Sequence, residues 1–388
     1  MNASPEKVTS RTQAATATWD NLSPLLVEIR ARRNEFSRTQ KIPKEIIDGF
    51  RRVGVYRAMT AKRFGGEERT PADFCRLVER ISEADGSAGW VASFGDGARY
   101  LAALPDDTLR KVYANGPDVV LAGALFPLQP AKRCAEGLIV NGVWPFASGS
   151  PEADLIGVGI TSEDDPSGDL PRVAVMPAEK VKIRPNWDVI GLQGTGSHDV
   201  VVSDVIVPEE WTLIRGGPPT LDRPIYRYPA VAFAAQAHAI VGIGIARSAI
   251  DEVIAMAETR ASITGAPVMA ERGYVQLEIA KAEAMLRSAR SFFYDATEEL
   301  WKEALKGEVN LGTTTLMRLA ATNAARQGAE VCRIASGLAG TEALYSTSNL
   351  ARAMCDSFVV AQHAALNEGT LQSAGRALLG SAIQPGFP

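Results

Sequence analysis

Histidine and cysteine are scarce in this chain of 388 residues, which limits the kinds of active site that it can build. The three histidines, His198, His238 and His363, lie far apart and none belongs to an HExxH-type cluster, so no metal site is expected. The four cysteines are scattered without a CxxC pair. That usage is typical of a protein of the reducing cytoplasm.

Several sequence signals are also missing. The chain has no GxxxxGK[ST] phosphate loop and no strand-linked GxGxxG, so neither nucleotide hydrolysis nor a nicotinamide site of its own is expected. It has no apolar run of about eighteen residues and no apolar core near its start, so neither a membrane span nor a signal peptide is expected. The net charge of −4 comes without a basic face, which argues against nucleic acid as a partner.

The pattern of apolar residues divides the chain into three predicted domains. Residues 1–118 contain amphipathic segments at helical spacing, with Thr70 and Asp73 as a candidate cap region. Residues 119–222 contain short runs rich in Val and Ile, separated by Gly, Pro, Asp and Ser, which predict a small antiparallel β domain. Residues 223–388 contain long helical segments with alanine-rich faces, which predict a tight four-helix bundle. The predicted fold is therefore mainly α with a central β domain.

Five strings along the chain support a resemblance to a known family. They are RFGGEE at 63–68, EADGSAGWV at 83–91, NGVWPFASG at 141–149, WDVIGLQGTGSHDVVVSDVIVP at 187–208 and HAALNEGTLQSAGRALLG at 363–380. Their order resembles the acyl-CoA dehydrogenase superfamily over nearly the whole chain. Within it they look closest to the oxygenase components of two-component flavin-dependent monooxygenases, which hydroxylate aromatic compounds.

The resemblance implies a set of partners for the chain. Reduced FMN or FAD would come from a separate NAD(P)H:flavin reductase, and molecular oxygen would add to the flavin as a C4a-hydroperoxide. The substrate would be a small aromatic compound such as a phenol or an indole. The family layout also suggests a homotetramer.

The string NGVWPFASG contains the first candidate residues for the flavin. A flavin ring needs apolar walls and a few aimed hydrogen bonds, which Trp144, Phe146 and Ser148 can supply. The resemblance implies that Phe146 and Ser148 contact the ring, with Ser148 near its N5 edge. The alternative is that the two aromatics are core residues and that Ser148 ends a strand.

Two other segments are candidates for cofactor binding. The resemblance implies that Trp187, Thr195 and Ser197 form a flavin-wall loop and that Arg260 pairs with the flavin phosphate. A planar guanidinium suits any phosphate. The alternatives are an ordinary glycine-rich turn, with His198 exposed in it, and a solvated cation at a helix end.

The catalytic and substrate candidates lie near the two ends of the chain. Asp356 and His363 are seven residues apart, so both can lie near one face of a helix. We expect the two together to manage the proton of the reaction, with Ser148 as the third catalytic candidate. The resemblance implies that His363 orients the substrate or protonates the flavin hydroperoxide, since imidazole exchanges protons near neutrality. Ser87 and Trp90 either line the substrate side or pack one helix on another.

Three other functions remain open from the sequence. Glu368, in the string NEGT, is the candidate base of an acyl-CoA dehydrogenase or oxidase, although the flanking strings favour the hydroxylases. An N- or S-oxygenating relative is a second alternative. A helical scaffold that has lost the flavin is the third.

Overall fold

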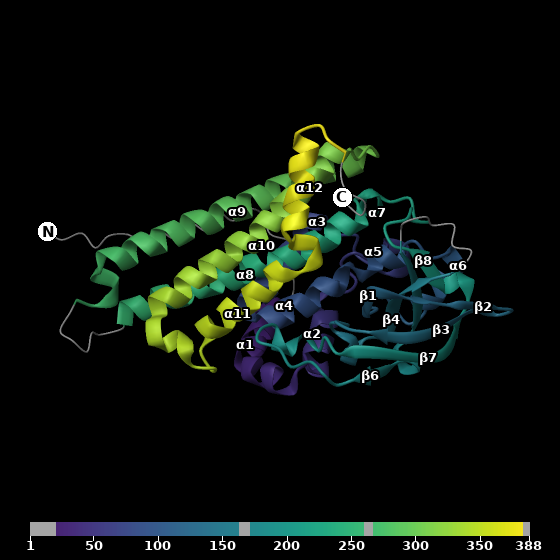
Figure 1. Cartoon of the computed structure of the whole chain (residues 1–388), viewed down its shortest axis with the longest axis horizontal. Helices are drawn as coiled ribbons and strands as arrows, with labels where there is room; N and C mark the ends of the chain where they lie inside the picture. Colours follow the sequence, from purple (N-terminus) through teal and green to yellow (C-terminus); the bar gives the residue numbers. More distant parts are fainter. Residues whose placement is uncertain (1–20, 163–170, 260–266, 383–388) are drawn as a thin grey trace.

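The computed structural model describes residues 21–162, 171–259 and 267–382 (Figure 1). The long C-terminal helices lie side by side at one end of the molecule, and the strands gather at the other end. The N-terminal helices lie between these two groups. The order along the chain, helices, then strands, then helices, is the predicted one.

The N-terminal helices carry the caps that the sequence predicts. Thr70 precedes α3, where its side chain accepts a hydrogen bond from the backbone N–H of Asp73 at 3.1 Å, and Pro71 occupies the first turn. The apolar faces of the first four helices pack together around Phe50 and Tyr56. The helices are α1 Leu22–Thr39, α2 Lys44–Val53, α3 Pro71–Ala84, α4 Gly86–Ser93, α5 Gly97–Leu101 and α6 Asp106–Val112.

The β domain is a pair of four-stranded sheets packed around a shared apolar core. One sheet has the order β1 Leu121–Pro130, β4 Leu155–Thr161, β5 Arg172–Pro177 and β8 Thr212–Ile214. The other has the order β2 Lys132–Cys134, β3 Gly137–Trp144, β7 Asp199–Val207 and β6 Lys182–Arg184. The antiparallel prediction holds for the other described pairs, but β1 and β4 run parallel.

Four long helices form the C-terminal bundle, as predicted, and two shorter helices flank it. Small residues let the helix backbones approach closely: a side chain at Gly328 would meet the carbonyl oxygen of Gly242 at 2.7 Å. The long helices are α8 Ala230–Thr259, α9 Gly273–Lys306, α10 Leu311–Ala339 and α11 Asn349–Gln362, with α7 Pro224–Arg227 and α12 Glu368–Leu378 beside them. Within the described ranges, no helix combines the length and apolar character needed to cross a bilayer.

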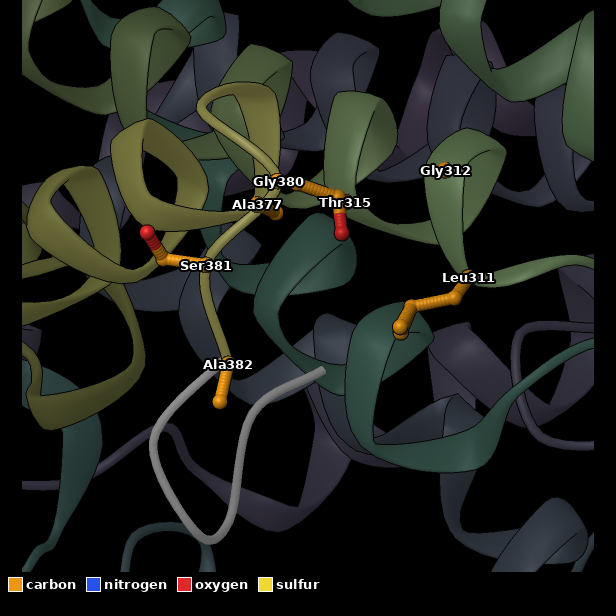
Figure 2. Close-up of a pocket in the computed structure, with 7 residues that line it drawn as sticks. All are labelled: Leu311, Gly312, Thr315, Ala377, Gly380, Ser381 and Ala382. Atoms are coloured by element: carbon orange, nitrogen blue, oxygen red, sulfur yellow. The ribbon is translucent and has the colours of Figure 1, made fainter.

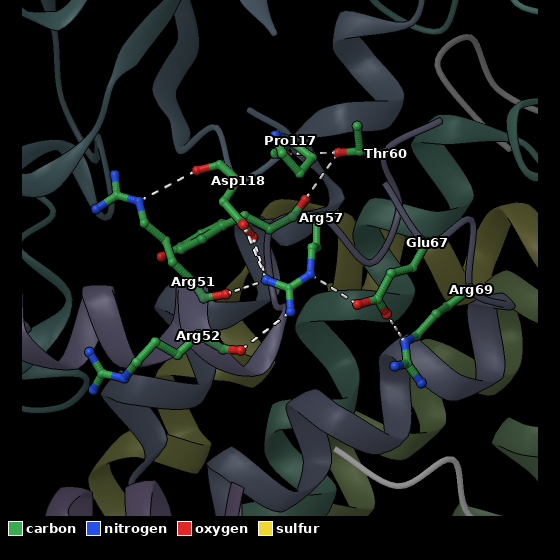
Figure 3. A network of polar contacts seen from close by, with 9 residues as sticks. Arg51, Arg52, Arg57, Thr60, Glu67, Arg69, Pro117 and Asp118 are labelled. Atoms are coloured by element: carbon green, nitrogen blue, oxygen red, sulfur yellow. Dashed lines mark hydrogen bonds and ion pairs between the residues drawn. The ribbon is translucent and has the colours of Figure 1, made fainter. Parts of the chain in front are cut away.

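A polar network joins the N-terminal helices to the segment that enters the β domain (Figure 3). The guanidinium of Arg57 bonds Glu67 at 3.0 Å and Asp118 at 3.1 Å, and it also donates to the carbonyl oxygen of Arg52. Arg69 pairs with the second carboxylate oxygen of Glu67. Because Asp118 lies three residues before the start of β1 at Leu121, this network fixes where the sheet starts relative to the helices.

Replacing Arg57 by Met should lower the free energy of unfolding by about 1–3 kcal/mol, because partly buried Asp118 loses its guanidinium partner and Glu67 keeps only Arg69. Chemical denaturation measures the change. Arg110→Met is the control, since the pair that Arg110 forms with Asp106 is exposed, and it should leave the midpoint unchanged. Equal midpoints for the two variants would contradict the role given to Arg57.

Candidate active site

A cavity of about 710 Å³ opens where the three parts of the chain meet. Its walls come from α4 and α5, from β1 and the loops beside β3 and β7, from α8 and α10, and from the segment that follows α11. The cavity brings together seven of the residues that the sequence singles out, which are Trp90, Phe146, Ser148, Trp187, Thr195, Ser197 and His363.

A second hollow of about 480 Å³ lies between the start of α10 and the end of α12 (Figure 2). Its lining residues carry no titratable side chain. They are Leu311, Gly312, Thr315, Ala377, Gly380, Ser381 and Ala382. This hollow therefore lacks the groups that acid–base or redox chemistry needs.

The two aromatic rings of NGVWPFASG have different places. Trp144 is fully buried in the β core, where its indole N–H donates to the carbonyl oxygen of Gly159 at 2.9 Å. The prediction that Trp144 forms a flavin wall is therefore wrong, because its ring points into the core and does not line the cavity. Phe146 lines the cavity, is 69% exposed, and meets Trp187 edge to face at 5.9 Å.

Phe146 holds its position at a cost in backbone energy. Its φ of 62° lies in the left-handed region, which costs a residue other than glycine roughly 1–2 kcal/mol. The turn is fixed by the N–H of Ser148, which donates to the carbonyl oxygen of Phe146 at 2.9 Å. The chain thus bends sharply after β3, and the bend presents the Phe146 ring and the Ser148 hydroxyl to the same cavity.

A chain of buried hydroxyls extends from Trp90 to Leu192. The indole N–H of Trp90 donates to Ser148 Oγ at 3.2 Å, and Ser148 Oγ lies 2.6 Å from Ser197 Oγ. Ser197 Oγ lies 2.6 Å from Thr195 Oγ1, which donates to the carbonyl oxygen of Leu192 at 2.9 Å.

The direction of this chain follows from counting protons. Each hydroxyl has one proton, so Thr195, which donates to Leu192, must accept from Ser197. Ser197 must then accept from Ser148. Ser148 therefore donates its single proton to Ser197 and accepts a hydrogen bond from Trp90. Toward any further partner its Oγ can only accept, through its remaining lone pair.

The site residues fit a reduced flavin. The reduced ring carries an N–H at N5, where the oxidised ring carries only a lone pair, so a hydroxyl restricted to accepting suits the reduced form. Phe146 and Trp187 supply aromatic surface at the same wall, and the cavity volume suits a small aromatic ligand. Phe146, Ser148, Trp187, Thr195 and Ser197 remain the candidate flavin residues.

The loop between β6 and β7 is held by a buried histidine. The backbone N–H groups of Asn186 and Trp187 both donate to His198 Nδ1, each at 3.1 Å. Burial lowers the pKa of His198, which keeps the ring neutral and able to accept. The expectation that His198 is exposed is therefore wrong: it fixes the start of the loop that carries Trp187.

Asp356 and Ser87 hold the other end of this loop. Asp356 is buried, and its Oδ1 accepts from the backbone N–H of Leu192 at 2.6 Å. Ser87 Oγ accepts from the backbone N–H of Gly194 at 3.0 Å. Neither side chain lines the cavity, so the predictions of a proton-managing Asp356 and a substrate-binding Ser87 are both corrected. Each is a positioning residue, since each uses its oxygen to hold the loop.

His363 lines the cavity just after α11 ends, and its ring is neutral. Its Nδ1 accepts from the backbone N–H of Ala365 at 3.3 Å, so the proton of the neutral ring lies on Nε2. Burial, together with the positive charges of Arg215 and Arg318, lowers the pKa of His363 to about 4. The expectation of proton exchange near neutrality is therefore corrected: His363 is a neutral hydrogen-bond donor at pH 7.

His238 is a functional candidate that the sequence analysis missed. Its ring stacks on Trp90 with centroids 4.5 Å apart and meets His363 edge to face at 4.8 Å. Ser93 Oγ donates to the carbonyl oxygen of Trp90, so His238 Nδ1 must donate to Ser93 and its Nε2 is left as an acceptor. Burial lowers the pKa of His238, so this ring is neutral as well.

The remaining candidates lie outside the cavity or outside the described residues. Glu368 has a side chain that is 85% exposed, lies 3.6 Å from Arg326, and does not line the cavity. It is therefore badly placed to take a proton from a substrate in the cavity. Arg260 lies outside the described residues.

Fold and site together define a chain of the acyl-CoA dehydrogenase fold. The family model described as acyl-CoA dehydrogenase, C-terminal domain, matches residues 236–368. The chain is 51% identical to an indole-3-acetate monooxygenase of Pseudomonas putida, over 93% of each chain. It is 46% identical to an indole-3-acetate monooxygenase of Acinetobacter baumannii, over 95% of each chain.

Solved structures show the same fold. The 3-HSA hydroxylase from Rhodococcus sp. RHA1 superposes with a TM-score of 0.87 and 25% identity, over 93% of this chain and 96% of that one. TdsC from Paenibacillus sp. A11-2, solved with FMN and indole, superposes with a TM-score of 0.79, over 93% of this chain and 96% of that one. At 20% identity, the second likeness shows the fold alone.

The chain thus belongs to the flavin-dependent monooxygenases with the acyl-CoA dehydrogenase fold. It is an oxidoreductase, an aromatic hydroxylase of the two-component type that uses reduced flavin and molecular oxygen. The resemblance inferred from the five strings is confirmed, and the scaffold alternative is wrong.

Replacing Ser197 by Ala should weaken the preference for reduced over oxidised flavin about fivefold, because Ser148 then regains a proton that it can donate. Anaerobic and aerobic titrations with FMN and with FAD measure the two dissociation constants. Ser150→Ala is the control, since in the described structure Ser150 Oγ has no hydrogen-bond partner. An unchanged ratio in Ser197→Ala would contradict the direction assigned to the hydroxyl chain.

Asp356 should make the protein less stable as the pH rises. Burial, and next the charge of Asp85, raise the pKa of Asp356 to about 7. The native state therefore keeps a proton that the unfolded chain loses near pH 4, so stability falls between about pH 4 and pH 7. Asp356→Asn keeps an oxygen for Leu192 and should show a shallower fall in melting temperature over that range. An equal fall in melting temperature between pH 4 and pH 7 in the wild-type chain and in Asp356→Asn would refute the raised pKa of Asp356.

Proposed function

We propose that the chain inserts one oxygen atom into the ring of an indole of the size of indole-3-acetate. The proposal rests on one arrangement, the neutral donor His363 beside the acceptor His238 in a cavity with aromatic walls. The identity of 51% with an indole-3-acetate monooxygenase supports this substrate class. A separate NAD(P)H:flavin reductase is proposed to supply the reduced flavin, since the sequence has no nicotinamide motif.

Ser148, His238 and His363 would each form one hydrogen bond in the proposed reaction. When bound, the reduced flavin supplies the two electrons that split dioxygen, so that one oxygen atom enters the ring and the other becomes water. Ser148 accepts from the N–H edge of the flavin and fixes its position. His238 Nε2 accepts from the indole N–H, and His363 Nε2–H donates to the oxygen atom that is being transferred.

The apolar walls of the cavity would exclude water from the reaction. Apolar side chains of the β domain and of α8, among them Leu213, Val175 and Ala234, line the space around the two histidines. Such walls keep water from the reacting oxygen and so limit its loss as hydrogen peroxide.

The surface of the C-terminal helices and the state of the cysteines support a proposed homotetramer and a proposed cytoplasmic location. The C-terminal part exposes large apolar side chains such as Leu344, Tyr345 and Phe358, which suits burial between subunits of a homotetramer. The cysteines Cys75, Cys134, Cys332 and Cys355 are all free thiols, as in a protein of the cytoplasm. Sedimentation of the purified chain tests the first proposal.

His363→Ala should lower the rate of indole-3-acetate hydroxylation roughly 100-fold, while dioxygen is still consumed and released as hydrogen peroxide. His363→Gln should restore part of the lost coupling, because its amide N–H can donate as Nε2–H does. Met354→Ala, an exposed change on α11, is the control. Product and peroxide are measured per dioxygen consumed, from pH 6 to pH 8, where the neutral His363 should add no ionisation step.

Full coupling in His363→Ala would remove His363 from the mechanism. A wild-type chain that forms only peroxide with indole-3-acetate, with other indoles and with phenols would overturn the proposed function.

A further inference from the structure

Two arginines that the sequence analysis did not single out line the same cavity. Arg215 directly follows β8, and its backbone N–H donates to the carbonyl oxygen of Pro171 at 2.9 Å. Arg318 lies on α10, is 4% exposed, and donates through Nη2 to the carbonyl oxygen of Ala365 at 3.3 Å. One guanidinium comes from the β domain and the other from the bundle, and both face the space that holds His363.

The two guanidinium groups lie close enough to influence each other and their neighbours. Burial, and then the charge of Arg215, lower the pKa of Arg318 to about 10. The same two charges act on His363. Tyr100 also lines the cavity, and its hydroxyl forms a hydrogen bond with Arg215. Tyr100 belongs to α5, so all three parts of the chain contribute to this corner.

The cavity has little negative charge to balance these cations. Among the described residues that line it, Asp96 is the single carboxyl side chain. Burial raises the pKa of Asp96 to about 7 against the charges of Arg99 and Arg215, so at neutral pH this carboxyl carries only part of a charge. His238 and His363 are neutral, as their hydrogen bonds and burial require. The cavity is therefore positively charged before a substrate enters.

We propose that Arg215 and Arg318 form a carboxylate-binding subsite that selects aromatic acids and places their ring against His238 and His363. The inference rests on the proposed function and adds the reason why the substrate must be an acid. A guanidinium offers a planar pair of N–H donors that matches a carboxylate, and the Tyr100 hydroxyl can supply a third donor. His363 lines the same cavity and its pKa is lowered by both guanidinium charges, so an acid held by the arginines has its ring near His363.

The subsite predicts discrimination between an acid and its neutral amide. Indole-3-acetamide has nearly the shape of indole-3-acetate but carries no charge to balance the guanidinium groups of Arg215 and Arg318. Because a hydrogen bond to a charged partner is stronger than one between neutral groups, the chain should bind the acid about 10- to 100-fold more tightly than the amide. A site that recognised the ring alone would bind both equally.

The test measures the dissociation constants of indole-3-acetate and indole-3-acetamide by calorimetry, for the wild-type chain and for Arg215→Gln and Arg318→Gln. Each variant should weaken binding of the acid at least about tenfold and leave the amide nearly unchanged. Arg318→Lys keeps the charge but loses the planar pair of N–H donors, so its affinity for the acid should lie between those of the wild-type chain and Arg318→Gln. Arg215→Gln carries the test by itself if Arg318→Gln does not fold.

Arg326→Gln is the matched control, because Arg326 lies on the same helix α10 and faces Glu368 at 3.6 Å outside the cavity. It should change neither dissociation constant. The affinity for reduced FMN, measured in parallel, should stay unchanged in Arg215→Gln and Arg318→Gln. A loss of FMN affinity with an unchanged preference for the acid would assign the two arginines to the flavin phosphate and overturn the proposal, as would equal weakening of acid and amide.

These binding measurements need no turnover, so they separate this proposal from the proposed function. A chain that binds the acid selectively but does not oxygenate it would keep the subsite and refute the reaction. A chain that oxygenates acid and amide equally well would keep the reaction and refute the subsite.

Discussion

The close approach of the segment 191–195 to α11 is the contact on which the site depends. Gly191 lies so near the helix that a side chain there would meet the carbonyl oxygen of Cys355 at 2.4 Å. The next residue, Leu192, donates its N–H to buried Asp356 and offers its carbonyl oxygen to both Trp187 and Thr195. One loop of the β domain is thereby fixed to the bundle, and the candidate flavin residues are positioned from it.

This contact also explains why the cavity is shared by all three parts of the chain. The start of α4 lies against Asp356, where a side chain at Gly86 would meet its Oδ2 at 2.7 Å, and Ser87 holds the same loop through Gly194. Trp90, on that helix, reaches Ser148. The hydroxyl chain, the two histidines and the two arginines therefore face one space, although they lie far apart in the sequence.

Much of this could be predicted from the sequence, because the signals are local. Helical spacing, short strands rich in Val and Ile and the order of five strings predict the fold. The same strings predict that Phe146, Ser148 and His363 face the site. Contacts across the fold could not be predicted. Trp144 and Phe146 are two residues apart, and nothing local shows that the first ring enters the core while a left-handed turn exposes the second.

The missed residues have a common physical cause. His238 lies in an apolar, alanine-rich segment of α8, and Arg318 lies on a helix with many alanines, so both have the surroundings of ordinary helix residues. Their roles depend on neighbours from other parts of the chain, such as Ser93 for His238 and Arg215 for Arg318. Asp356 was placed correctly on a helix, but its partner Leu192 lies 164 positions away.

The most direct test of the account uses isotopically labelled dioxygen. The purified chain is mixed with chemically reduced flavin and indole-3-acetate, the labelled gas is added, and the product is analysed by mass spectrometry after a single turnover. The account predicts a hydroxylated ring that carries one labelled oxygen atom. Unlabelled product, or labelled hydrogen peroxide without any hydroxylated ring, would contradict it.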